Sequence, residues 1–309
     1  MYDDLPSPEL HDELVERIRQ LVHPLVPVKT GRRPRLDHLE GIRSVVFDVY
    51  GTMFISRSGD IGFKDETGDV EALRQAMEHY NLDFEPEAPA RGIKLLGHAI
   101  EARHRARRLE DIPHPEVEIR DIWKDVLRAL SRQELIEVVP GEEHITRLAV
   151  EFEIRYNPPW LMPGMLMTLN RLKDAGLQLG IISNSQFYTP LSLEALTGQD
   201  LLPLGFDPKL LKWSYRYGIA KPSLGFYELL VEELERHHDI RPQEVLYIGN
   251  DMLNDIYPAD RLGMRTALFS GDKRSLKLRE DDMRCNRISP NLELTYMPQL
   301  LDCLPRLST

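Results

Sequence analysis

Polar residues that could do chemistry stand directly after apolar runs in this sequence. Asp48 follows the β-branched and aromatic run 44–47 and comes shortly before Gly51 and Thr52. Such a run is typical of a buried parallel strand, so it delivers Asp48 to the carboxyl end of that strand, where open α/β sheets bind ligands. An aspartate there is either a cap that accepts backbone hydrogen bonds or a nucleophile, and this stretch alone favours neither.

Later strand ends and loops carry further polar side chains, namely Ser183 with Asn184, Lys221 before a proline, and the pair Asp251 and Asp255. Each has an ordinary explanation by itself, as a helix cap, an exposed lysine or an N-terminal capping turn. Parallel strands share one carboxyl edge, however, so these groups are expected to converge with Asp48 at one rim.

The elements that must position these residues alternate between helices and strands from residue 158 onward. Apolar runs predict strands at 177–182, 244–249 and 264–269, separated by helical patterns. This alternation predicts an α/β fold with a doubly wound, Rossmann-like parallel sheet. Residues 65–157 show helical patterns only. The predicted organisation is therefore an N-terminal helical extension at 1–40, an α/β core at 41–64 and 158–309, and an inserted α-helical domain at 65–157.

Three segments outside the strand pattern carry weaker signals. Residues 8–22 have the apolar spacing of one amphipathic helix, and the Pro-rich basic stretch 24–35 is expected to be a solvated linker. The basic run 98–108 is either a solvated helix face or a source of positive potential over an anionic substrate. The segment after Gly271 is expected to be peripheral.

Composition narrows the classes of partner. The chain has 309 residues and a formal net charge of -11, which argues against nucleic acid and anionic membranes as partners. No apolar run approaches the ~20 residues that cross a bilayer, and the first residues are acidic, so a cytoplasmic protein is expected. Cys285 and Cys303 have neither zinc-site nor disulfide-framework spacing. The sequence leaves open whether the protein forms a homo-oligomer.

In the order of these motifs the sequence resembles the haloacid dehalogenase superfamily over roughly residues 41 to 272. Its members begin with an Asp nucleophile in a D-x-[D/Y]-G-T pattern, here residues 48–52. A Ser or Thr after an apolar strand follows, here Ser183, then a Lys before Pro, here Lys221, and then an acidic pair, here Asp251 and Asp255. The helical insert between the first two motifs resembles the cap domain of the dehalogenase and phosphatase subgroup.

The resemblance implies a hydrolase of a small anionic substrate. Asp48 would be the nucleophile, Lys221 would orient it, and the Ser183 hydroxyl would donate to the transferred group, leaving an aspartyl intermediate for water to hydrolyse. Mg²⁺ would offset the charge of a phosphoryl group. Its expected ligands are Asp48, the backbone carbonyl of Tyr50, Asp251 and Asp255, and the expected substrate-binding residues are Thr52, Tyr50, Asn184 and Tyr227.

Two positions depart from the phosphatase pattern. Tyr50 stands where phosphatases carry an Asp that protonates the leaving group, and a phenol with a pKa near ~10 is a poor replacement at neutral pH. Tyr50, together with Tyr227, is instead typical of 2-haloacid dehalogenases. Asp251 and Met252 instead favour a phosphatase, because dehalogenases carry Ser and Asn at these two positions.

Three hypotheses follow. The first is a Mg²⁺-dependent hydrolase of a small phosphorylated substrate that lacks the usual Asp general acid. The second is a metal-free 2-haloacid dehalogenase-like hydrolase, and the third is a binding or regulatory protein with little turnover on the same scaffold.

Overall fold

A six-stranded sheet forms the centre of the computed structural model, which describes residues 6–56 and 66–304. The strand order is β5-β4-β1-β6-β7-β8, and every neighbouring pair is parallel. This arrangement confirms the predicted α/β class. The strands are β1 (Ser44–Phe47), β4 (Gln178–Ser183), β5 (Phe206–Trp213), β6 (Val245–Gly249), β7 (Arg265–Phe269) and β8 (Leu292–Leu294).

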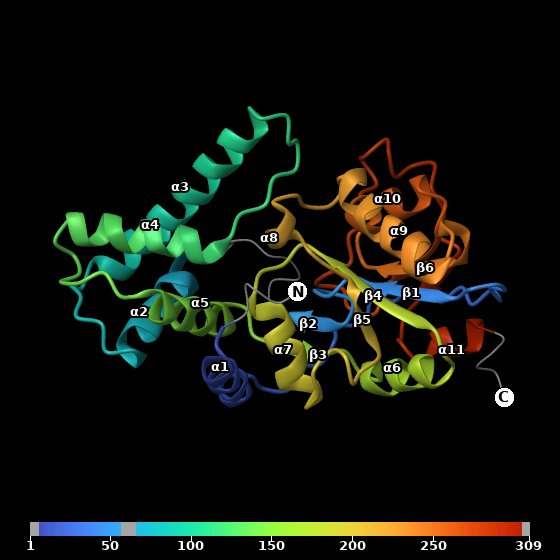
Figure 1. Cartoon of the computed structure of the whole chain (residues 1–309), viewed down its shortest axis with the longest axis horizontal. Helices are drawn as coiled ribbons and strands as arrows, with labels where there is room; N and C mark the ends of the chain where they lie inside the picture. Colours follow the sequence, from blue (N-terminus) through green and yellow to red (C-terminus); the bar gives the residue numbers. More distant parts are fainter. Residues whose placement is uncertain (1–5, 57–65, 305–309) are drawn as a thin grey trace.

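Both faces of the sheet are buried, as the continuous apolar run of β1 predicts. Val45 and Phe47 pack with helices α6, α7 and α11 on one face, and Val46 packs with α9 and α10 on the other (Figure 1). The bounds of these helices are α6 (Met165–Asp174), α7 (Tyr188–Thr197), α9 (Leu224–His238), α10 (Tyr257–Arg261) and α11 (Gln299–Cys303). Shorter turns are α8 (Ser214–Tyr217), η1 (Pro242–Glu244) and the π-helical η2 (Met252–Ile256).

Four helices between β2 (Phe54–Ser56) and β3 (Pro159–Leu161) gather to one side of the sheet (Figure 1). They are α2 (Glu66–His79), α3 (Ala88–Arg108), α4 (Ile119–Arg132) and α5 (Glu142–Tyr156), and we call them the helical insert. A two-stranded antiparallel sheet of β2 and β3 brings together the chain on either side of the insert. Within the described ranges, no helix is both long and apolar enough to cross a bilayer.

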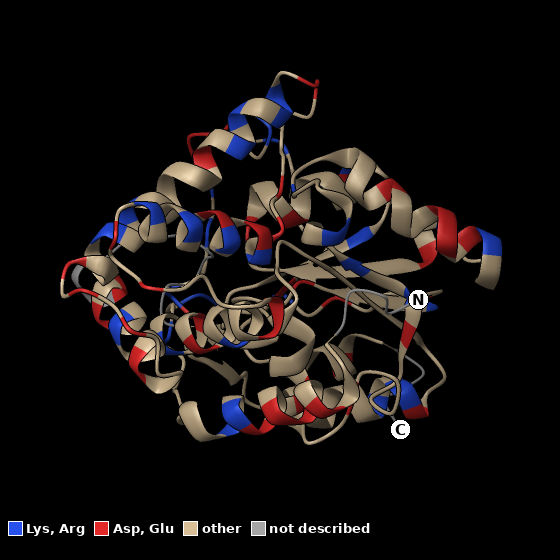
Figure 2. Cartoon of the chain, turned by 60° about the vertical axis from the view of Figure 1, so that its left-hand side comes forward, with Lys and Arg blue, Asp and Glu red and all other residues tan. Residues whose placement is uncertain are grey.

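The basic run on α3 lies on an exposed surface and is matched by nearby acidic residues. Arg103 pairs with Asp125 at 2.9 Å, and Arg107 pairs with Glu110 at 2.9 Å. Figure 2 shows Lys and Arg positions interspersed with Asp and Glu positions along the ribbon of the helical insert. Local pairing of this kind fits the solvated-face interpretation of the run.

The connector at 24–35 is mostly exposed, as its composition predicted, but its backbone is hydrogen-bonded to another part of the chain. Its backbone runs along the C-terminal part of the chain, where Arg35 exchanges hydrogen bonds with Glu293 of β8 and Val28 accepts one from Lys273. The edge strand supplies partners for the backbone of this Pro-rich stretch, which cannot be recognised from local composition. Before it, α1 (Pro8–Leu21) forms the predicted amphipathic helix and packs against α5 and α7.

The segment after Gly271 is not peripheral, contrary to expectation. It adds β8 to the sheet, and residues 272–279 lie against the loops that follow β1 and β6. Asn250 donates its amide to the Ser275 carbonyl at 2.6 Å, and the Lys277 N–H donates to the Asn250 carbonyl at 3.0 Å. Gly51 has φ +88, and a Cβ there would come within 2.6 Å of Ser275 Cβ. Only glycine allows this close approach of the two segments.

Candidate active site

Asp48 lies at the carboxyl end of β1 with polar side chains from three other segments around it. Lys221 donates to Asp48 Oδ1 at 2.6 Å, and the Ser183 hydroxyl lies 3.5 Å from the same oxygen. Thr52 donates to Asp48 Oδ2 at 3.2 Å. The carboxyl ends of β1 and β4 and the Lys221 loop therefore meet, as the shared edge of a parallel sheet requires.

Lys221 is held between two carboxylates. Its ammonium donates at 2.6 Å to Asp48 and at 2.6 Å to Asp255, and its side chain is only 4% exposed. Burial alone would lower the pKa of Lys221, but the charges of Asp255 and Asp48 raise it above its usual value. The lysine is therefore a fixed positive charge at neutral pH.

Asn184 positions Lys221 through its backbone. The amide oxygen of Asn184 accepts from the Lys221 N–H at 2.7 Å, and its NH₂ group donates to the Lys221 carbonyl at 3.4 Å. The side chain that was predicted to bind substrate is thus engaged in fixing the loop that carries the lysine.

Asp255 links Lys221 to the loop after β6. Its Oδ1 accepts from Lys221 and from the Tyr247 hydroxyl at 3.2 Å, and its Oδ2 accepts from the N–H groups of Asn250 at 3.0 Å and Asp251 at 2.9 Å. A carboxylate has about four lone-pair directions, so these contacts fill its capacity. Asp255 acts here as a structural acceptor that orients the lysine.

Asp251 faces an arginine rather than Asp48. Arg279 donates to both carboxylate oxygens of Asp251, with its terminal nitrogen 2.6 Å from Oδ2 and Nε 3.0 Å from Oδ1. No motif marks Arg279, which lies in the tail that was expected to be peripheral. The amide oxygen of Asn250 lies 3.1 Å from the Thr52 hydroxyl, so it competes with Asp48 Oδ2 for the single proton of that hydroxyl.

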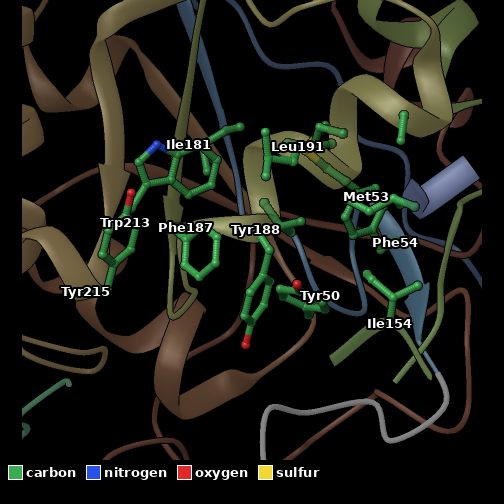
Figure 3. Close-up of a cluster of buried hydrophobic side chains, with 14 of the residues drawn as sticks. Tyr50, Met53, Phe54, Ile154, Ile181, Phe187, Tyr188, Leu191, Trp213 and Tyr215 are labelled. Carbon is green, nitrogen blue, oxygen red and sulfur yellow. The ribbon is translucent and has the colours of Figure 1, made fainter. Parts of the chain in front are cut away.

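The two tyrosines that set the sequence apart from phosphatases are both buried in side-chain packing. The Tyr50 hydroxyl is hydrogen-bonded to Thr189 Oγ1 at 3.1 Å, and its ring contacts Phe54 within the cluster shown in Figure 3. Burial raises the pKa of Tyr50 further. Tyr227 donates to the Asn254 carbonyl at 2.7 Å. Both hydroxyls are therefore used in holding loops together.

A cavity of about 360 Å³ lies between the helical insert and this edge of the core. Asn184 and Ala220, the chain neighbours of Ser183 and Lys221, form part of its wall. Its apolar and aromatic lining includes Leu96, Ile100, Val117, Trp123, Phe152 and Tyr156, and its polar lining includes Glu116, Glu153, Gln186 and Tyr188. Of the described residues that line it, none is Lys or Arg. The cavity favours a neutral, largely apolar group over an anionic one.

The family model of the haloacid dehalogenase-like hydrolases matches residues 42–274 of this sequence. The chain belongs to this family. The hydrolase is 25% identical to a glyceraldehyde 3-phosphate phosphatase of Pyrococcus furiosus, over 53% of this chain and 69% of that enzyme. It is 28% identical to the Methanocaldococcus jannaschii enzyme of the same name, over 47% of this chain and 57% of that one.

The fold of the hydrolase also resembles that of a 2-haloacid dehalogenase from Pseudomonas syringae pv. tomato. The TM-score is 0.54 at 19% identity, and the match covers 85% of this chain and 97% of that one. A likeness at this identity supports the fold alone.

The carboxylates of the hydrolase, as they are arranged here, do not fit the Mg²⁺ site that the resemblance predicted. Asp255 has its capacity filled, and Asp251 is held by Arg279. Among the described residues, no group of three acidic, His or Cys side chains could hold a metal ion. Of the predicted side-chain ligands, only Asp48 keeps an oxygen with capacity to spare, since Oδ2 accepts one hydrogen bond here.

Glu153 is a buried acid in the cavity wall, and we expect it to make the stability of the hydrolase depend on pH. It accepts from the Tyr188 hydroxyl at 3.1 Å, and burial raises its pKa from 4.5 to about 7. Between these two values the unfolded chain releases a proton that the folded state keeps, so stability falls as pH rises. Across this pH window the wild type should lose about 3 kcal/mol of its free energy of unfolding. Glu153→Gln should abolish this loss, because the amide does not titrate.

Urea unfolding of the wild type and of Glu153→Gln at pH 5 and pH 8 measures this difference. The matched control is Glu143→Gln, on the same helix at an exposed position, which should keep the wild-type pH dependence. Equal pH dependence in Glu153→Gln and the wild type would contradict the assignment.

Proposed function

We propose that this hydrolase cleaves phosphate monoesters of neutral, largely apolar alcohols, with Asp48 as the nucleophile. The observation that carries the proposal is the placement of Asp48. Its Oδ2 keeps acceptor capacity, while Lys221 fixes Oδ1 beside a cavity with an apolar lining. The phosphatase names of two known relatives favour phosphoryl transfer over other reactions of this family.

In the proposed first step, Asp48 Oδ2 attacks phosphorus, the bond from phosphorus to the alcohol oxygen breaks, and the leaving oxygen takes a proton from solvent water. Lys221 lies close enough to Asp48 to stabilise negative charge on the phosphoryl oxygens, and the Ser183 hydroxyl can donate to them. In the second step water attacks phosphorus, which restores the Asp48 carboxylate and releases phosphate.

No side chain beside Asp48 supplies the leaving-group proton in this proposal. Tyr50 is hydrogen-bonded to Thr189, and its raised pKa makes it a weak acid. We therefore propose that the enzyme favours esters whose alcohols leave without general-acid help, such as aryl phosphates. Mg²⁺ dependence remains a prediction of the family resemblance, and no step above uses the ion.

A 2-haloacid dehalogenase-like reaction is the second candidate. Two observations favour it, the buried Tyr50 and the engagement of Asp251 by Arg279. Carbon–halogen cleavage has no phosphoryl charge to neutralise, so it does not require a divalent cation at this site.

The phosphatase and dehalogenase-like candidates can be separated by measuring turnover of three substrates, each with Mg²⁺ and with EDTA. The substrates are 2-naphthyl phosphate, phosphoglycolate and 2-chloropropionate. We expect phosphate release from the naphthyl ester at least about 10-fold faster than from phosphoglycolate, because none of the described residues that line the cavity is a Lys or Arg that could pair with a second anionic group. Halide release without phosphate release would favour the second candidate instead.

A cavity-filling variant sharpens this test. Gly97 lies in α3 and lines the cavity, and a Cβ there would meet nothing within 4 Å. Gly97→Leu should therefore fold and slow turnover of the naphthyl ester more than that of a small phosphate ester. Gly141→Ala, at another position with open space but outside the cavity lining, is the matched control.

A further inference from the structure

Arg279 reaches the candidate site from a segment whose backbone is fixed to the loop after β6. The Met252 N–H donates to the Lys277 carbonyl at 2.9 Å, and the Lys277 N–H donates to the Asn250 carbonyl at 3.0 Å. These bonds set Arg279, two residues further on, next to Asp251. Arg279 has φ +52, a left-handed conformation that is unfavourable for a non-glycine residue. Its side-chain contacts with Asp251 help to offset that cost.

The hydrogen-bonding capacity of Asp251 is fully used in this arrangement. Oδ1 accepts from Arg279 Nε at 3.0 Å and from the N–H groups of Leu253 at 2.9 Å and Asn254 at 3.2 Å. Oδ2 accepts from the terminal nitrogen of Arg279 at 2.6 Å and from its Nε at 3.2 Å. A cation that bound Asp251 would therefore have to replace the arginine fork, since the two backbone N–H groups belong to the N-terminal turn of η2.

Arg279 is placed so that it could be replaced. Its side chain is 36% exposed, whereas that of Asp251 is 5% exposed. Part of the Arg279 side chain is thus accessible to solvent. Displacement of the guanidinium would leave the buried carboxylate without its compensating charge, which is unfavourable unless another cation takes its place.

We propose that Arg279 and a divalent cation compete for Asp251, and that Arg279 holds this carboxylate in the metal-free protein. The proposal goes beyond the proposed function, none of whose steps uses a cation. Competition at one carboxylate makes the apparent affinity for the cation depend on how firmly the arginine is held. Cation binding can be measured without turnover, so failure of the proposed reaction and failure of this proposal are distinguishable.

The competition can be tested by titrating the full-length protein with Mn²⁺. Calorimetry and the electron paramagnetic resonance signal of free Mn²⁺ both measure the binding. Arg279→Ala should bind Mn²⁺ at least about 10-fold more tightly than the wild type, because nothing then has to be displaced. The matched control is Arg284→Ala, which removes an exposed arginine of the same segment that pairs with Asp282 at 2.7 Å. Its Mn²⁺ affinity should equal that of the wild type.

The double variant Asp251→Asn with Arg279→Ala should lose the gain in affinity, which assigns the gain to Asp251. Should Arg279→Ala fail to fold, Arg279→Lys keeps the charge but loses the bidentate fork, and it should bind Mn²⁺ more tightly than the wild type by a smaller factor. The proposal would be overturned if the folded Arg279 variant bound Mn²⁺ no more tightly than the wild type. It would also be overturned if the gain in Mn²⁺ affinity persisted in the double variant.

Discussion

Asp48→Asn should reduce phosphate release by at least about 10³-fold, because the amide oxygen is a far weaker nucleophile than the carboxylate. The substitution conserves shape, and Lys221 keeps Asp255 as its partner at 2.6 Å. The fold should therefore survive, which circular dichroism and thermal unfolding can verify. Steady-state phosphate release from 2-naphthyl phosphate is the direct measurement.

Asp37→Asn is the matched control for Asp48→Asn, because Asp37 is exposed and lies 3.9 Å from its nearest paired arginine. It should retain wild-type turnover. A folded Asp48→Asn protein with undiminished turnover would rule out the nucleophile role. If the wild type turns over none of the substrates in the panel, the hypothesis of a binding or regulatory protein gains support.

Lys221→Met should destabilise the folded protein by about 3–5 kcal/mol, because it leaves two buried carboxylates without their shared cation. Asp48 and Asp255 both lie 2.6 Å from the Lys221 ammonium. Their mutual repulsion and their burial would then be uncompensated at neutral pH. Equilibrium unfolding in urea at pH 7 measures the difference, and turnover should be lost as well.

Lys212→Met separates this charge effect from the loss of a buried lysine as such. Lys212 is also buried and lies 3.4 Å from the Tyr217 hydroxyl, but it forms no ion pair among the residues that the structure describes. Its replacement should change stability by about 1 kcal/mol or less. Similar losses in the two variants would show that the carboxylate pair does not depend on Lys221.

Tyr50 stands where a donor of the leaving-group proton would be expected. A phenol could in principle donate to a leaving group, but this one is committed to Thr189 of α7 and is buried among aromatic rings. Its position is therefore that of a packing residue between β1 and α7. This arrangement fits both an enzyme that needs good leaving groups and the dehalogenase-like alternative, which needs no acid at this point.

Some features of the protein are determined by the sequence alone. The run 44–47 and the later apolar runs predicted parallel strands, because only strands buried on both faces are continuously apolar. The geometry of a parallel sheet then required Asp48, Ser183 and Lys221 to approach one another, and the structure brings them together. Local periodicity also predicted α1 and the wholly helical character of the insert.

Only the tertiary structure decided what each polar group faces. Asp251 and Arg279 are 28 residues apart, and their pairing depends on a backbone ladder between two irregular segments that leave no periodic signal. The same is true of Tyr50 with Thr189 and of Asn184 with the Lys221 backbone. A motif specifies which side chains reach the edge of the sheet, whereas their orientation follows from partners that are distant in the chain. Whether the acidic pair can accept a cation is for that reason a property of the fold and not of the motif.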